Sequence, residues 1–236
     1  MKSIHGCVSC QQRYCAKKVG LFESFDDQDM ERLLPLIERM TLPKGSYLFQ
    51  EGDPADRLYI LNGGSAKVFR NTKDGKEQIL YLLSEGDYYG ELSLLRTDTN
   101  ELSALALEDT YLCTLGKKDF DALVTAYPSL YAKMLEHAYS RIQALERSLA
   151  TIQAKDVDSK LATLLLQLAD QFGIQKLGAI EVPLKLTREE MANAIGLTRE
   201  TVSRKLSQFQ SDGLIVLVDQ RTLQLIDTEG LMTLKG

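Results

Sequence analysis

Long apolar runs are missing from this chain of 236 residues. No stretch approaches the roughly 18 apolar residues that a membrane-spanning helix needs. The opening residues, MKSIHGCVSC, also lack the apolar segment of a secretory signal. Hydrophobic residues at 44% and charged residues at 26% match ordinary soluble usage. We therefore expect a soluble protein of the reducing cytoplasm, with no membrane partner.

An excess of basic charge is missing too, because the formal net charge is −5. Any nucleic-acid contact must then come from a local basic surface. The sequence also contains no Walker loop, no metal-binding histidine motif and no nucleophile elbow. These absences argue against an enzyme.

Cysteines are few, four in all, yet three of them fall within nine residues. Cys7, Cys10 and Cys15 have the spacing C-x2-C-x4-C, and Cys113 lies far along the chain. In a reducing compartment such a set indicates chemistry rather than a structural staple. Four thiolates suit a 4Fe-4S cluster or tetrahedral zinc, while a disulfide switch or inert thiols remain alternatives.

Glycine-containing turns punctuate the first half of the chain. They fall at residues 52–53, 63–64, 74–75 and 86–87, about 11 residues apart, between short apolar runs such as LYILNGGSAKVF. This pattern predicts an antiparallel barrel or roll. We expect the roll domain to occupy 19–127, after an N-terminal cysteine segment at 1–18.

The pattern changes to a helical period over 128–156. Apolar residues are spaced alternately three and four apart, as in the a/d seam of paired helices. The charged residues between them, Arg141 included, are expected to keep the other faces in water, and His137 needs no ligand role. One interpretation is a helix that packs on its own domain, and the sharper one is the interface of a homodimer. The seam positions are Leu135, Ala138, Ile142, Leu145, Leu149 and Ile152.

The C-terminal region, 157–236, reads as a helix, a polar connection (GIQKLGAIEVPLK), two further helices and a short β-hairpin. Thr187 and Glu190 fit a capping box, and Thr198 is a hydroxyl N-cap for the last of these helices. Gly196 lies at the tight turn between the two helices, where helix-turn-helix units often carry glycine. The region is therefore expected to form a winged helix-turn-helix.

The sequence therefore predicts an α+β chain with a β-roll, a long helix and a winged helix-turn-helix. This arrangement resembles the catabolite activator and FNR (CRP/FNR) superfamily of bacterial transcription regulators. The resemblance covers about residue 19 to 232. It is carried by three segments: EGDPADRLYILNGGSAKVF, GDYYGELSLL and LTREEMANAIGLTRETVSRKLSQFQSDGLI. It implies a cytoplasmic homodimer that binds double-stranded DNA and RNA polymerase.

The cysteines make the chain most similar to the FNR branch. That resemblance implies an oxygen-labile 4Fe-4S cluster on Cys7, Cys10, Cys15 and Cys113, whose loss breaks up the dimer. The last gap in the N-terminal set is one residue shorter than is usual, which keeps zinc and a disulfide open as alternatives.

A cyclic nucleotide is not expected. Family members that bind one carry a phosphate-binding cassette, which is a GEL turn followed by an arginine and a small hydroxyl residue before alanine. Here Ser103 and Ala104 fill the last two places, but Leu102 precedes them and Arg96 lies at the other end of the loop. Leucine cannot neutralise a phosphate, and burying that charge unpaired is costly.

The expected recognition helix begins TRETVSRKL, with Arg199, Glu200, Ser203 and Arg204 along one exposed side. Glu200 can accept from a cytosine amino group, and Arg204 can contact guanine O6 and N7. The resemblance implies that this pair reads a TGA core in an inverted repeat. Five cations on this surface outnumber three glutamates, which should attract phosphates. The predicted DNA-contact set also includes Thr198 and Lys185, and the remaining two cations are Arg188 and Lys205.

Overall fold

The computed structural model of the chain describes residues 19–72, 75, 77–95, 99–153, 156–176 and 178–235. Cys7, Cys10 and Cys15 lie outside these residues. The chain divides into two compact units, one made of residues up to 70 with 81–142, the other of 71–80 with 143–236.

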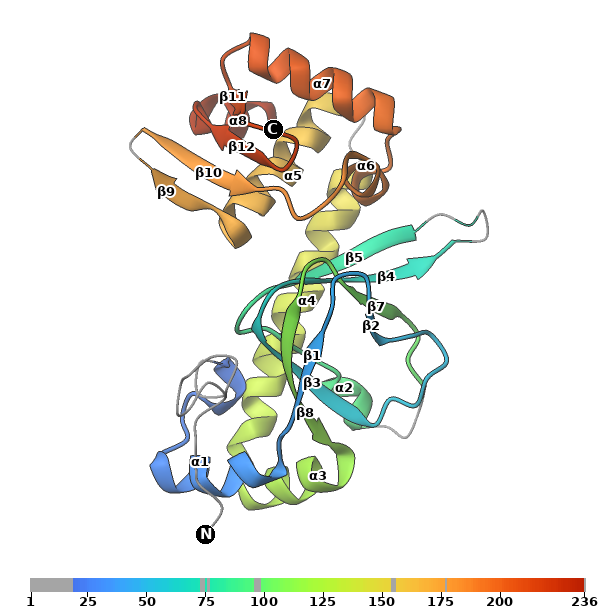
Figure 1. The fold of residues 1–236 in the computed structure, drawn as a ribbon, viewed down its shortest axis with the longest axis vertical. Helices are drawn as coiled ribbons and strands as arrows, with labels where there is room; N and C mark the ends of the chain where they lie inside the picture. Colours follow the sequence, from blue (N-terminus) through green and yellow to red (C-terminus); the bar gives the residue numbers. More distant parts are fainter. Residues whose placement is uncertain are drawn as a thin grey trace. The chain divides into compact units, whose positions relative to one another are not determined.

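The predicted β-roll is confirmed as two antiparallel sheets, with strand orders β1-β8-β3-β6 and β2-β7-β4-β5 (Figure 1). Gly90, before the GEL turn's glutamate, has φ of +102°, and a Cβ there would collide with the carbonyl oxygen of Arg57. Only glycine fits this turn without strain. The strands are β1 (Glu38–Leu42), β2 (Tyr47–Phe49), β3 (Arg57–Gly63), β4 (Ala66–Asn71), β5 (Glu77–Leu83), β6 (Tyr88–Tyr89), β7 (Ser103–Ala106) and β8 (Thr110–Gly116).

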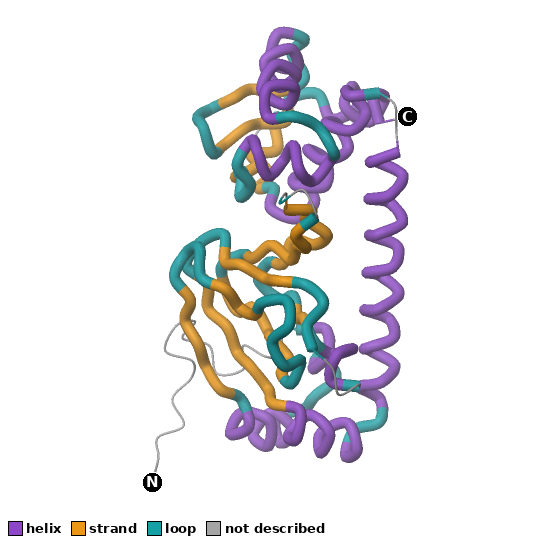
Figure 2. The backbone as a smooth tube through the Cα atoms, turned by 90° about the vertical axis from the view of Figure 1, so that its right-hand side faces the viewer, coloured by secondary structure: helices purple, strands orange, loops and turns teal. Residues whose placement is uncertain are grey.

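Helices cover one face of the first sheet, and the first half of α4 runs alongside the roll (Figure 2). Asp26 and Asp29 form a reciprocal capping box that fixes where α1 begins. The long helix predicted over 128–156 is present as α4. The helical elements of this unit are η2 (Gly20–Phe22), α1 (Asp27–Leu33), η3 (Leu34–Leu36), α2 (Glu91–Leu94), α3 (Lys117–Ala126) and α4 (Ser129–Gln153).

Strand β8 separates two hydrophobic cores because successive side chains of a strand point to opposite faces. Leu112 belongs to the core inside the roll. Cys113 and Leu115 belong to the core under the helices, together with Leu21 and Phe22 from the start of the described chain. The cysteine thus lies on the helix-covered face.

The second unit contains the predicted helix-turn-helix, built from α6 and α7. The segment expected to be a polar connection instead forms two strands, so the sheet has four strands in the order β11-β12-β10-β9. Its elements are α5 (Val157–Phe172), β9 (Ile174–Lys176), β10 (Ala179–Pro183), α6 (Arg188–Ile195), α7 (Arg199–Ser211), β11 (Ile215–Leu217), β12 (Thr222–Leu225) and α8 (Thr228–Lys235).

Among the described residues, no helix has both the length and the apolar composition to cross a membrane.

Candidate nucleic-acid interface and sensory site

The caps predicted for α6 and α7 are present. Thr187 accepts from the backbone N–H of Glu190, whose side chain accepts in return from the N–H of Thr187. Thr198 Oγ1 accepts from the N–H of Thr201 at 3.2 Å. Gly196 ends α6 in the left-handed conformation, with φ of +67°. These local bonds set where the recognition helix begins and how it leaves the turn.

Helix α7 has a buried and an exposed side, as expected. Its core residues are Val202, Leu206 and Phe209. The four residues predicted to face DNA bases are all exposed, namely Arg199, Glu200, Ser203 and Arg204. They form one solvent-facing surface on the helix, and their contacts with DNA remain a prediction.

Two cations of the predicted basic surface are partly withdrawn from it. Lys205 Nζ lies 2.7 Å from Asp158 Oδ1, so a carboxylate of α5 balances its charge. Arg188 is half-buried, donates to Met191 Sδ at 3.5 Å, and has its pKa lowered by burial. Lys185 is also half-buried. The sequence therefore overestimated the exposed positive charge, because it does not show that Asp158 lies beside α7.

The predicted seam on α4 includes strongly exposed apolar side chains. Leu135 is 72% exposed and Ile142 53%, while Ala138 and Leu145 are half-buried. Tyr139, which is not one of the predicted seam positions, is also exposed on this helix. The side chains of the last two seam positions, Leu149 and Ile152, lie outside the described part of the chain.

Cys113 is almost fully buried, at 1% exposure, and lies on β8 between β1 and β3. Asn62 Nδ2 donates a hydrogen bond to Cys113 Sγ at 2.8 Å. Within the described residues, no group of three or more histidine, cysteine or acidic side chains is arranged to hold a metal ion. The other three cysteines belong to the segment outside that description.

The GEL turn is engaged by the chain's own helix α4. Glu91, fully buried, has its Oε1 atom 3.0 Å from His137 Nδ1 and 3.2 Å from Arg141 Nη1. Arg141 Nη2 also donates to the carbonyl oxygen of Tyr88 at 2.5 Å, and its guanidinium lies 4.5 Å from the ring centre of Tyr89. The cassette's carboxylate is thus paired within the chain.

Two expectations concern Arg141 and His137. Arg141 is expected to face water, but its side chain is only 14% exposed. His137 is expected to have no ligand role, and the structure shows its ring stacked on Tyr88 with 4.0 Å between ring centres. Their four-residue spacing places them on the same face of the helix. The spacing in the sequence indicates that the two side chains share one face of the helix, but it does not indicate which residues that face contacts.

The roll interior next to the cassette is filled by aromatic rings. Phe49 stacks on Tyr89 with 5.2 Å between centres, and burial raises the pKa of the Tyr89 hydroxyl to about 12. Ser103 Oγ accepts from the backbone N–H of Glu51 at 3.0 Å, while Leu102 is half-buried beside this core. Arg96 lies outside the described residues.

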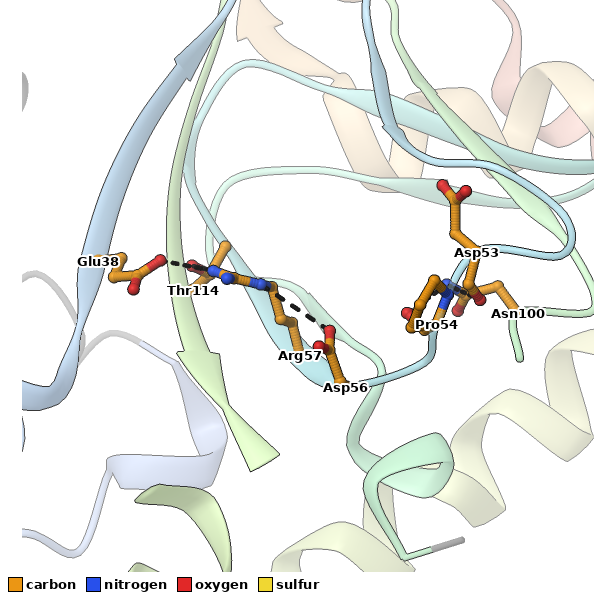
Figure 3. A network of polar contacts seen from close by, with 7 residues as sticks. All are labelled: Glu38, Asp53, Pro54, Asp56, Arg57, Asn100 and Thr114. Atoms are coloured by element: carbon orange, nitrogen blue, oxygen red, sulfur yellow. Dashed lines mark hydrogen bonds and ion pairs between the residues drawn. The ribbon is translucent and has the colours of Figure 1, made fainter. Parts of the chain in front are cut away.

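Two polar networks hold the strands around this cassette (Figure 3). Arg57, which begins β3, donates to Glu38 on β1 and to Thr114 on β8. The Asn100 side chain, just before the cassette's last residues, lies 3.4 Å from the carbonyl oxygens of Asp53 and Pro54. The end of the cassette is thereby tied to the turn before β3.

Comparisons with known proteins cover both units. The family model described as the cyclic nucleotide-binding domain matches residues 39–127, and the Crp-like helix-turn-helix domain matches 159–234. The CRP-like cAMP-activated global transcriptional regulator of Mycobacterium tuberculosis is 30% identical over 91% of this chain and 95% of its own. The transcriptional activator protein FnrA of Stutzerimonas stutzeri is 29% identical over 90% of this chain and 87% of its own.

The structure of FixK2 from Bradyrhizobium japonicum has the same fold, with a TM-score of 0.76 at 22% identity over 85% of this chain and 98% of that one. With a roll, a long helix and a Crp-like helix-turn-helix in the same order, the chain belongs to the CRP/FNR family and is a DNA-binding transcription regulator, not an enzyme.

Proposed function

We propose that this regulator responds to oxygen or to the cellular redox state through Cys7, Cys10, Cys15 and Cys113, with a 4Fe-4S cluster as the favoured group. The observation that carries the proposal is the position of Cys113 on the helix-covered face of the roll, in one core with Val19. Val19 follows Cys15 by only four residues in the sequence, so the N-terminal cysteine segment enters the described chain at this core.

The chemistry of the donor set fits such a group. Cys113 Sγ accepts an N–H from Asn62, an acceptor role that a thiolate or a cluster-bound sulfur can also fill. Cys7, Cys10 and Cys15 would supply the other three thiolates. When bound, the cluster would supply oxygen-sensitive iron and sulfide chemistry.

The state of the cassette argues against cyclic nucleotide as the signal. Glu91 is already paired with His137 and Arg141, and aromatic rings fill the neighbouring interior. The position before Ser103 is leucine, which offers no charge to a phosphate. Because one relative is described as cAMP-activated, cyclic nucleotide remains a competing hypothesis for the signal. A zinc site or a disulfide that includes Cys113 is the stronger alternative to the cluster.

The protein's output is proposed to be a homodimer acting on DNA in the cytoplasm. The exposed apolar residues Leu135 and Ile142 support a parallel pairing of two α4 helices. Such a dimer presents two α7 helices to an inverted repeat, with Glu200 and Arg204 on the TGA core. Bound there, it would act on transcription through contact with RNA polymerase.

The test is purification of the full chain without oxygen, followed by assays for iron, sulfide and zinc and by visible absorbance before and after exposure to air. Brown protein with iron and sulfide, losing its colour in air, supports the cluster. Colourless protein whose DNA binding changes with thiol oxidation supports the disulfide, and stoichiometric zinc supports a zinc site.

Cys113→Ser is the matched variant, since serine is close in size and its hydroxyl can accept the Asn62 hydrogen bond. It should retain the fold and lose the oxygen dependence of DNA binding. If oxygen dependence is unchanged in this variant, neither a cluster nor a long-range disulfide operates. Calorimetric titration with cAMP decides the remaining hypothesis.

A further inference from the structure

Lys205 lies on the recognition helix next to Arg204, but its side chain is directed into the protein. Its ammonium nitrogen lies 2.7 Å from Asp158 Oδ1 and 3.0 Å from Gln208 Oε1. The side chain is only 20% exposed, whereas Arg204 is exposed. Two adjacent cations of α7 therefore face different surroundings.

Asp158 lies in the first turn of α5, the first helix described after α4. Asp156 caps this helix, with its carboxylate accepting from the backbone N–H groups of Asp158 and Ser159 at 3.3 and 3.0 Å. Behind this turn, Leu161 and Leu165 are completely buried. The carboxylate of Asp158, 24% exposed, is thus carried by a fixed backbone rather than by a flexible surface loop.

The ion pair joins this fixed turn to the middle of α7. Residues 201, 205 and 208 are spaced four and three apart, so Lys205 lies on the side of α7 that includes Thr201 and Gln208. Glu200, Ser203 and Arg204 lie outside this row and are exposed, whereas Thr201 and Lys205 within it are half-buried. Holding Lys205 on Asp158 opposes rotation of α7 about its axis and so keeps the base-facing residues pointing outward.

We propose that Lys205 and Asp158 form a positioning pair that fixes the recognition helix on α5, and that Lys205 is not one of the phosphate contacts. Its charge is compensated within the protein, so it releases no counterion from DNA. Its contribution to DNA binding passes through the orientation of Glu200 and Arg204.

Salt dependence separates these two roles. Each lost phosphate contact reduces the slope of log affinity against log salt by about 0.9. A positioning residue changes the affinity for the specific site and leaves this slope alone. The inference rests on DNA binding by the helix-turn-helix and is independent of what the cysteines hold.

The experiment measures affinity by fluorescence anisotropy at several salt concentrations, using the full chain and two duplexes. One duplex is selected by the wild-type protein from a randomised pool, and the other is an unrelated sequence of equal length. The variants are Lys205→Met, Asp158→Asn, the double variant, and the charge-reversed pair Lys205→Asp with Asp158→Lys. Lys160→Met on α5 removes an equal charge without touching the pair, and thermal unfolding by circular dichroism verifies that each variant folds.

Each single variant should weaken specific binding about tenfold with an unchanged salt slope, and the double variant should be no weaker than the worse single one. The charge-reversed pair should recover most of the loss, and the unrelated duplex should be little affected. If Lys205→Met does not fold, the near-isosteric Asp158→Asn tests the same link. The proposal is overturned if Lys205→Met lowers the slope by about 0.9 per bound chain, if Asp158→Asn tightens binding, or if the single effects add.

Discussion

Asn62 on β3 donates its side-chain N–H to the sulfur of Cys113 on the adjacent strand β8, over 2.8 Å. The two residues are 51 positions apart in the chain. Cys113 is buried and Asn62 is half-buried, so water competes little for the sulfur. The Cys113 sulfur therefore accepts a hydrogen bond from the neutral amide of Asn62. The spacing of the cysteines in the sequence does not predict this partner.

This relationship predicts the effect of Asn62→Leu. Hydrogen bonds to ligand sulfurs withdraw electron density and help to set the reduction potential of an iron-sulfur centre. In a protein that holds the proposed cluster, removing the donor should lower the midpoint potential and speed the loss of visible absorbance in air. Spectroelectrochemical titration of anaerobically purified protein measures the first effect, and stopped-flow mixing with air-saturated buffer measures the second.

Asn62→Asp is the matched control, because it keeps the size of the side chain but replaces the donor with an acceptor. It should lower the potential at least as far as leucine does. Equal potentials for all three proteins would mean that the amide has no influence on the sulfur.

The cluster of Glu91, His137 and Arg141 carries a prediction about stability. Breaking a buried ion pair by removing one partner leaves an uncompensated charge, whereas removing both charges costs much less. Arg141→Met should therefore reduce the free energy of unfolding by at most about 3 kcal/mol, since His137 Nδ1 still lies 3.0 Å from Glu91 Oε1. The double variant Glu91→Gln with Arg141→Met should recover at least half of that loss in urea titrations, since His137 can still pair with an amide oxygen.

Additive losses in the double variant would show that Arg141 acts through its hydrogen bond to the Tyr88 carbonyl or its stacking on Tyr89, rather than through its charge pair with Glu91. Arg141→Lys distinguishes the two further, because lysine keeps the charge and loses the planar contact.

What the sequence predicted correctly depends mostly on local rules. The start of α7 follows from Thr198 and its neighbour Thr201, and the inward positions Val202 and Leu206 follow from helical periodicity. The turn at Gly196 needs positive φ, which glycine provides. Each of these features is set within about one or two turns of helix.

The features that sequence reasoning missed join distant segments. Glu91 and Arg141 are 50 positions apart, and Lys205 and Asp158 belong to different helices. The sequence predicts a polar connection where β9 and β10 form, because the stretch GIQKLGAIEVPLK shows no clear apolar alternation around β9. In the structure β9 is exposed throughout. Its pairing with β10 is decided by the neighbouring strand rather than by its own residues.

The seam on α4 predicts the oligomeric state. Ile142 is 53% exposed in the single chain, so a charge there should not disturb the chain's own fold. In a dimer, Ile142→Glu would place two like charges opposite each other in a desolvated seam and should produce monomers. Ser140→Glu adds the same charge at an exposed position outside the seam and should remain dimeric. Sedimentation velocity reports both, and a dimeric Ile142→Glu would place the interface elsewhere.

The exposed side of α7 predicts which bases are read. A two-fold dimer places its recognition helices in successive major grooves, so selection from randomised duplexes should enrich inverted repeats with TGA half-sites about 10 base pairs apart. Arg204→Ala removes the proposed bidentate guanine contact and should cost about 1 to 3 kcal/mol per half-site, with relaxed preference at that base pair. Lys185→Ala should instead weaken all sequences alike and reduce the salt slope, because a phosphate contact carries no base information. Enriched sites that lack a two-fold TGA/TCA pair, or unchanged base preference in Arg204→Ala, would contradict the assignment of Glu200 and Arg204.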